Sequence, residues 1–239
     1  MGDHDPVSDL QDGSKYARIS AALRVQVEEL TPGQALPSER ELAQEWGVAR
    51  MTIRRALAEL VNAGLVRTVH GSGSVRAPEP VSLRIQLGSF AAALRAHHLD
   101  PQTTILQVSA EVEPPPAVRD FLGSEHGVIC VRRLRHANGT PLALECTWLR
   151  ADLLTIDEAR QLTGSLYDHL AREGRQPDAG EESVRADLPD ADEAQALQVP
   201  PSRPVFRLTR RARLAAQPVE YAEAVLPADR CELWFPLTP

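Results

Sequence analysis

Cysteine is scarce in this sequence, and several kinds of segment are absent from it. The three cysteines, Cys130, Cys146 and Cys231, are odd in number, far apart and in no C-x-x-C motif. We therefore expect reduced thiols in a cytoplasmic protein, with no disulfide framework and no metal site. No apolar run is long enough to span a bilayer, and the acidic, polar N-terminus lacks the pattern of a signal peptide.

The patterns that mark common enzymes are also missing. The sequence has no Ser-His-Asp or Cys-His grouping, no glycine-rich phosphate loop and no metal-binding motif. The pair His97-His98 is a poor chelate, because adjacent residues on a helix face different directions. We therefore predict no catalytic residue, no bound metal and no cofactor.

The composition is that of an ordinary soluble globular protein, but its charge is unevenly placed. The chain has 239 residues, 43% of them hydrophobic and 25% charged, which allows one large or two small domains. Its net charge is −7, yet residues 36–77 hold six arginines against four acids. This mildly positive segment can attract nucleic-acid phosphates even though the whole chain is acidic.

Residues 36–75 predict two short helices followed by a glycine-rich hairpin. Ser38 and Glu41 form the capping box that starts a helix, and Gly47 ends it in a left-handed conformation. A second helix is expected over residues 50–63. Its core-facing residues at helical spacing are Ile53, Ala56, Leu57 and Leu60.

The opposite face of this second helix carries arginines near its start. Arg50 and Arg54 are four apart and share a face, with Thr52 close by. Such a helix fits the major groove, where arginine can bind the O6 and N7 of guanine. Two strands should follow, joined by residues 70–74, whose glycines permit close approach to DNA. The alternative is that the arginines merely solvate the helix, but the order of cap, stop, arginine pair and glycine tip favours DNA binding.

These segments resemble the DNA-binding domain of the GntR family of bacterial transcriptional regulators. The resemblance lies in L-P-S-E-R-E-L-A, G-V-A-R-M-T-I-R-R-A-L-A-E-L and G-L-V-R-T-V-H-G-S-G-S-V. It implies a winged helix-turn-helix that binds double-stranded DNA. Ser74-Val75 departs from the family's usual Thr-Phe, which weakens the packing of the wing strand. The positions that the resemblance implies for DNA contact, with their neighbours, are Ser38, Glu39, Arg40, Arg50, Thr52, Arg54, Arg55, His70, Gly71 and Ser72.

Four segments follow from these patterns. Residues 1–13 are expected to be a disordered tail, and residues 14–77 the winged helix-turn-helix, with its first helix over residues 15–30. Pro78-Glu79-Pro80 is a stiff linker at residues 78–80. Residues 81–239 form the second domain.

The second domain has the pattern of an α+β fold on an antiparallel sheet. Asn138-Gly139 predicts one hairpin, because both residues tolerate the positive φ of a tight turn. A second hairpin joins PVFRLTRRARLA to QPVEYAEAVL. The other expected elements are a helix after Ser89, strands over residues 104–113 and 182–186, and helices over residues 117–122, 157–161 and 165–173.

This half resembles the UTRA effector domain of the HutC subfamily, whose fold is similar to chorismate lyase. The resemblance lies in S-F-A-A-A-L-R, R-R-L-R-H-A-N-G-T-P-L-A-L-E, G-S-L-Y-D-H-L, Q-P-V-E-Y and A-D-R-C. It implies effector binding and dimerisation, hence a homodimeric repressor on an inverted-repeat operator. Two departures are Pro-Ala-Asp-Arg-Cys at residues 227–231, where Arg-Gly-Asp-Arg-Tyr is frequent, and Ala216-Gln217, where glycine is common.

Several polar residues of this domain suit a small anion. Arg133 and Arg135 lie two apart on one strand and face the same side, with Glu145 on the partner strand. The alternative is a cross-strand ion pair on a solvated face, and Glu220 can equally be a structural edge residue. By resemblance, the effector is an anionic metabolite such as a phosphorylated amino sugar. The candidate contacts are Ser89, Phe90, Arg133, Arg135, Glu145, Ser165, Tyr167 and Glu220.

We therefore predict a DNA-binding repressor controlled by a small anion. The main alternative is a metabolite-transforming enzyme of chorismate-lyase-like fold tethered to DNA. A GntR protein fused to an aminotransferase is excluded by length, and an all-helical effector domain conflicts with the Asn138-Gly139 hairpin.

Overall fold

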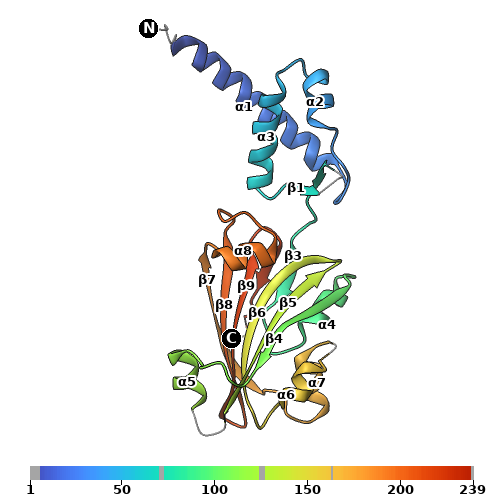
Figure 1. Cartoon of the computed structure of the whole chain (residues 1–239). Coiled ribbons are helices and arrows are strands. Elements are labelled where there is room, and N and C mark those ends of the chain that lie inside the picture. Colours follow the sequence, from blue (N-terminus) through green and yellow to red (C-terminus); the bar gives the residue numbers. More distant parts are fainter. Residues whose placement is uncertain (1–5, 70–72, 124–126, 163, 238–239) are drawn as a thin grey trace. The chain divides into compact units, whose positions relative to one another are not determined.

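A computed structural model of the protein describes residues 6–69, 73–123, 127–162 and 164–237, with side chains from Tyr16 onward. The chain forms two compact units, residues 1–79 and 80–239 (Figure 1). Among the described residues, no helix is both long and apolar enough to cross a membrane.

In its described residues, the first unit contains three helices and a short pair of strands. The helices are α1 (Pro6–Glu29), α2 (Glu39–Glu45) and α3 (Arg50–Asn62), and β1 (Val66–Val69) pairs antiparallel with β2 (Gly73–Arg76). Leu23, Leu42 and Ile53, one from each helix, are completely buried in its core. The periodicity of apolar residues therefore placed all three helices.

The start of α1 differs from the expected disordered tail over residues 1–13. The helix begins at Pro6, so residues 6–13 are helical. Proline suits the first turn of a helix because its φ is already helical and its missing N–H has no partner there anyway. A helix that is already nucleated extends at low cost, which explains the longer element.

The caps of the two short helices are as predicted. The Ser38 side chain accepts a hydrogen bond from the Glu41 N–H, and the Glu41 carboxylate accepts one from the Ser38 N–H at 2.8 Å. Gly47 has a φ of +61° and Gly64 a φ of +77°, the left-handed conformation that ends a helix. These local signals fix where α3 begins and which side it exposes.

The second unit is built on a six-stranded antiparallel sheet, which confirms the α+β class. A separate pair joins β3 (Val81–Arg84) to β10 (Cys231–Trp234) in parallel. In the order β4-β5-β6-β9-β8-β7, the sheet's strands are β4 (Pro101–Ser109), β5 (Val128–Ala137), β6 (Thr140–Arg150), β9 (Gln217–Pro227), β8 (Val205–Leu214) and β7 (Ala179–Asp187).

Helices cover both faces of this sheet (Figure 1). On one face, α5 (Pro116–Leu122) packs on Cys130, Trp148 and Tyr221, and α8 (Ala191–Leu197) packs beyond it on a second cluster. The other face carries α4 (Phe90–Ala96), α6 (Ile156–Arg160) and α7 (Leu166–Arg172). Because strand residues alternate between faces, the inner strands β5, β6, β8 and β9 supply core side chains to both layers.

Several elements differ from the sequence predictions. The strand expected over residues 104–113 is β4, which begins at Pro101 and ends at Ser109. The strands β3 and β10 and their pairing were not predicted, because each strand is short and its partner lies at the other end of the unit's sequence. Helix α8 was also missed, although Asp190 and Glu193 form a capping box that marks its start.

The two hairpin turns contrast in their chemistry. Asn138 and Gly139 have φ values of +49° and +74°, as predicted for the β5–β6 turn. The β8–β9 turn consists of Ala215 and Ala216, one residue earlier than expected, with φ values of +49° and +68°. Left-handed alanine is strained by its Cβ, so this turn destabilises the fold.

We expect Ala216→Gly to raise the free energy of unfolding by about 0.5–1 kcal/mol. Relief of the left-handed strain exceeds the extra chain entropy that glycine adds to the unfolded state. Urea unfolding measures the change. The matched comparison is Ala92→Gly, at an exposed position of α4, which should lower stability by a similar amount. Equal destabilisation by both changes would contradict the assigned strain.

Candidate functional site

The exposed face of α3 presents a small group of cationic and apolar side chains. The side chains of Arg50 and Arg54 are 60% and 56% exposed, and Met51 is 66% exposed. The opposite side of α3 is the core face, because Ile53 and Ala56 are completely buried. The arginines predicted for DNA contact therefore point away from the core.

Glu39, at the start of α2, holds both arginines. Its carboxylate accepts hydrogen bonds from Arg54 Nε at 3.0 Å and Nη2 at 2.8 Å, and lies 3.6 Å from Arg50 Nη2. The hydrogen bond from Arg54, with the charges of Arg54 and Arg50, outweighs desolvation and lowers the pKa of Glu39. Glu39 thus orients the two guanidinium groups side by side.

The structure separates Arg55 from this group. Its guanidinium lies over the Tyr16 ring of α1, 4.5 Å from the ring centre. Consecutive helical residues point about 100° apart, so Arg54 and Arg55 cannot share one face. Arg55 therefore braces α1 against α3, a role that its sequence position did not reveal.

The remaining predicted DNA residues surround the same helix ends. Ser38 caps α2, Arg40 is exposed on its first turn, and Thr52 is half-buried in the first turn of α3. His70, Gly71 and Ser72 lie outside the residues that the structure describes. Met51 was not among the residues predicted to contact DNA. An apolar residue on the solvent-exposed side of the helix, between Arg50 and Arg54 in the sequence, could have indicated it.

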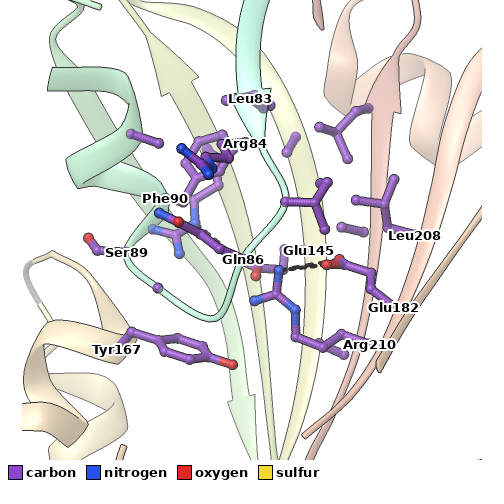
Figure 2. Close-up of a pocket in the computed structure, with 18 of the residues that line it drawn as sticks. Leu83, Arg84, Gln86, Ser89, Phe90, Glu145, Tyr167, Glu182, Leu208 and Arg210 are labelled. Carbon is purple, nitrogen blue, oxygen red and sulfur yellow. Dashed lines mark hydrogen bonds and ion pairs between the residues drawn. The ribbon is translucent and has the colours of Figure 1, made fainter. Parts of the chain in front are cut away.

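A cavity opens in the second unit between β3, α4, α7 and the sheet (Figure 2). Together with the space that opens to solvent, it spans about 880 Å³ that no protein atom fills. Seven of the eight predicted effector residues line it: Ser89, Phe90, Arg133, Arg135, Glu145, Ser165 and Tyr167. Glu220 lies behind this lining and contacts it through Tyr167.

Two arginines and one carboxylate form the charged floor of the cavity. Arg133 Nη2 and Arg135 Nε each lie 3.0 Å from Glu145 Oε2. The arginines are 1% and 4% exposed, so the alternative of a solvated surface pair does not hold. Burial alone raises the pKa of Glu145, but the charges of Arg133 and Arg135 outweigh it and lower this pKa to about 2.

Arg133 has hydrogen-bonding capacity that the described part of the chain does not use. Its Nη2 also donates to Thr147 Oγ1 at 3.1 Å, but its Nε and Nη1 have no partner there. A buried donor without a partner costs stability. Such a group on a cavity wall is suited to an acceptor supplied by a ligand.

Tyr167 and Glu220 form a buried pair behind this floor. The Tyr167 hydroxyl donates a hydrogen bond to Glu220 Oε2, and Glu220 is 1% exposed on the central strand β9. Burial raises the pKa of both groups. Glu220 is therefore neither an exposed edge residue nor a direct lining residue, because it acts on the cavity through Tyr167.

The two serines have structural partners as well as cavity positions. Ser89 caps α4 and donates to Asp168 Oδ2 at 3.1 Å, and Ser165 caps α7. Phe90 lies beside the floor, with the Arg135 guanidinium 5.5 Å from its ring centre. These contacts orient the walls around the arginines.

Sequence reasoning missed the wall that β7 and β8 contribute. Arg210 Nη2 lies 2.9 Å from Glu182 Oε2, and its guanidinium carbon lies 5.8 Å from the Tyr167 ring centre (Figure 2). Arg84 and Gln86, from β3 and the segment after it, line the cavity as well. Only an alignment of β7 with β8 brings Glu182 opposite Arg210, so no local signal was available.

Residues 227–231, which depart from the HutC pattern, make structural contacts between elements of the second unit. Arg230 Nη1 donates to the carbonyl oxygens of Pro141 at 2.5 Å and Leu197 at 2.8 Å. Asp229 lies 3.3 Å from the buried Arg203. This motif ties β6 and the end of α8 to the start of β10.

The lowered pKa of Glu145 predicts a dependence of stability on pH. A carboxyl with a depressed folded-state pKa stabilises above its unfolded value, near 4.5, and loses this contribution as pH falls towards 2. The Glu145 side chain is 21% exposed, so we expect a loss of roughly 2 kcal/mol, below the full linkage value. Urea unfolding at about pH 5 and about pH 3 should show a steeper loss for the wild type than for Glu145→Gln. Equal slopes would refute the assignment.

A helix with exposed arginines in one unit and a polar cavity in the other are the features of a ligand-regulated DNA-binding protein. Residues 15–75 match the gntR family of bacterial regulatory proteins, and residues 96–232 match the UTRA domain. The chain belongs to the GntR family and is HutC-like.

Relatives along almost the whole chain agree with this assignment. The mannosyl-D-glycerate transport/metabolism system repressor MngR of Escherichia coli is 31% identical over 83% of this chain and 85% of its own. The histidine utilization repressor of Pseudomonas putida is 30% identical, covering 91% and 90%. The crystal structure of PhnF from Mycobacterium smegmatis superposes with a TM-score of 0.64 at 25% identity, over 92% and 99%.

These matches give the general function. The chain is a DNA-binding transcriptional repressor whose UTRA domain binds a small-molecule effector. The alternative of a metabolite-transforming enzyme is excluded, because the family and its curated relatives are regulators. The six-stranded sheet likewise excludes an all-helical effector domain.

Proposed function

We propose that the chain acts in the cytoplasm as a homodimer that represses transcription from an inverted-repeat operator. A small anionic metabolite changes its affinity for this DNA. Each protomer inserts α3 into the major groove of one half-site, so two-fold symmetry in the protein matches two-fold symmetry in the DNA. The supporting feature is the exposed group of Arg50, Met51 and Arg54.

These three side chains are suited to different features of the base pairs. Arg54 and Arg50 offer guanidinium groups for guanine O6 and N7, and Met51 offers an apolar contact for the methyl group of thymine. Glu39 holds both arginines extended in the free protein. On DNA, the arginines exchange part of these contacts for bases, so less side-chain entropy is lost at the encounter.

The effector that this cavity fits carries both an anionic group and hydrogen-bond donors. The unused Nε and Nη1 of Arg133 carry this proposal, because they need an acceptor from outside the chain. Glu145 and Glu182 accept hydrogen bonds from hydroxyl or amino groups. A phosphorylated amino sugar has this arrangement, and so does a sugar joined to a carboxylate, as in the name of the relative MngR.

Coupling between the two units requires differential binding. The effector must bind one arrangement of the dimer more tightly than the other, and its effect on DNA affinity equals that difference. Because the two sites lie in separate units, this proposal does not require the ligand to contact DNA.

Two titrations test the proposal. A thermal-shift screen with phosphorylated amino sugars, other sugar phosphates, sugar acids and urocanate should yield an anion that raises the Tm of the full chain. Fluorescence anisotropy with DNA from the chain's own upstream region should then show a tight, sequence-specific complex of two protomers whose affinity changes with that anion. Binding of one protomer per site, or equal affinity for all duplexes at low salt, would overturn the dimeric operator model.

A further inference from the structure

Two of the three cysteines meet on the sheet face opposite the effector cavity. Cys130 on β5 and Cys146 on β6 are diagonal neighbours, because Cys130 pairs with Trp148 and Cys146 with Arg132. Their Sγ atoms are 3.4 Å apart. Both are free thiols, and their separation of sixteen residues along the chain gives no hint of this contact.

The surroundings of this pair favour reaction at sulfur. Cys130 is 4% exposed at the edge of the apolar cluster below α5, whereas Cys146 is partly exposed and gives access from solvent. One thiol donates a hydrogen bond to the other sulfur. This contact lowers the pKa of Cys130, and the Arg132 guanidinium adds to the effect against the burial of the group. The thiolate is the form that attacks an oxidant.

We propose that Cys130 and Cys146 form an oxidation site, at which hydrogen peroxide converts the two thiols into one disulfide within the chain. The site is separate from the DNA-binding helix and from the effector cavity, so it goes beyond the regulatory function proposed above. It makes the redox state of the cell a second input to the same domain.

The reaction balances with the peroxide as the only oxidant. The Cys130 thiolate attacks one peroxide oxygen, the O–O bond breaks, and a sulfenic acid forms as hydroxide leaves and takes up a proton to give water. The sulfur of Cys146 then attacks the sulfenic sulfur, the S–S bond forms, and the sulfenic hydroxyl leaves as a second water with the Cys146 proton. The two thiols lose two electrons in total, and the peroxide gains them.

The closure requires little movement. A disulfide bond is about 2.05 Å long, so the two sulfurs must approach by about 1.4 Å, which side-chain rotation and a slight shear of the strands can supply. The residues next to Cys146 link the disulfide to the cavity. Glu145 and Thr147 point to the opposite face, where both contact Arg133. The bond therefore fixes the β5–β6 register directly behind the effector cavity.

Cys231 is the internal control. It is 2% exposed on β10, its thiol donates to the Pro227 carbonyl at 3.2 Å, and burial raises its pKa to about 12. It should remain a thiol under conditions that oxidise the pair. If the Cys231 thiol stays reduced, a loss of two thiols can be assigned to Cys130 and Cys146.

Thiol counting on the full chain tests the proposal. After hydrogen peroxide treatment and denaturation, the reduced protein's three thiols should fall to one, and peptide mapping should show Cys130 joined to Cys146. Dithiothreitol should restore all three. Cys231→Ser should still lose two thiols and form the same joined peptide, whereas Cys130→Ser should form none.

Two results would overturn the inference. One is a wild-type protein that keeps all three thiols after peroxide treatment. The other is a loss of thiols by bridges between chains, or by further oxidation to sulfinic acid, without a peptide joining Cys130 and Cys146. Both readouts come from the wild-type chain, so they do not depend on whether a variant folds.

Discussion

Arg133→Met should weaken binding of the effector strongly while leaving the fold intact. Arg133 is 1% exposed, and its Nε and Nη1 lack a partner among the described residues. A ligand anion that fills this gap gains charge-assisted hydrogen bonds worth about 1.5–3 kcal/mol. We therefore expect roughly a 10- to 100-fold weaker affinity for the anion, measured by the ligand-dependent rise in Tm and by calorimetry.

The stability of this variant distinguishes a ligand contact from a structural ion pair. Glu145 keeps Arg135 as a partner at 3.0 Å when Arg133 is replaced, so no carboxylate is left unpaired. Methionine also removes the cost of burying a guanidinium that is only partly satisfied. We expect the free energy of unfolding without ligand to change by less than about 1 kcal/mol.

Arg185→Ala is the comparison for loss of a positive charge in the same sheet. This arginine is 67% exposed on β7 and pairs with Asp187, and it should leave ligand affinity and stability nearly unchanged. An Arg133→Met protein that unfolds early but still binds the anion with wild-type affinity would show that Arg133 serves the fold alone.

Arg54→Ala should weaken operator binding by about 1–3 kcal/mol, with the loss concentrated at one base pair. Arg54 is 56% exposed and aligned by Glu39, so its guanidinium can reach a base edge by exchanging part of its contact with Glu39. Anisotropy titrations on the operator and on single-base variants measure the effect. The wild type should discriminate at the contacted position, and Arg54→Ala should not.

Arg55→Ala is the matched comparison on the same helix. The Arg55 guanidinium lies 4.5 Å from the centre of the Tyr16 ring, so its loss should lower stability by about 0.5–1 kcal/mol and leave base preference unchanged. If Arg54→Ala reduces affinity equally on all sequences, Arg54 touches only phosphate. If Arg55→Ala relaxes base preference instead, the assigned face of α3 is wrong.

Much of the first unit could be predicted because its signals are local. The Ser38–Glu41 capping box, the glycines after α2 and α3, and the apolar spacing of α3 act within a few residues. Steric and hydrogen-bonding rules then leave few alternatives for the backbone. The role of Arg55 was not local, because it depends on how α1 packs against α3.

The floor of the effector cavity was also within reach of the sequence. Arg133 and Arg135 share a face by strand alternation, and Asn138-Gly139 predicts the hairpin that places β6 beside them. Their exact partner was not predictable, because a register shift between Arg135 and His136 sets Glu145 opposite Arg133. The sequence could not show whether these two arginines and the carboxylate lie in water or in a buried cavity. The burial of both arginines depends on α4, α7 and β3, which cover this face from distant parts of the chain.

The sequence by itself determined the helix α3 with its exposed arginines, the α+β class, the first hairpin and most of the predicted residues that line the cavity, because short-range periodicity and turn chemistry specify them. Only the tertiary structure brought Glu182 and Arg210 to the cavity, paired β3 with β10, and set Cys130 beside Cys146. Those contacts join residues far apart in the chain, and their geometry arises from packing many elements at once rather than from any local preference.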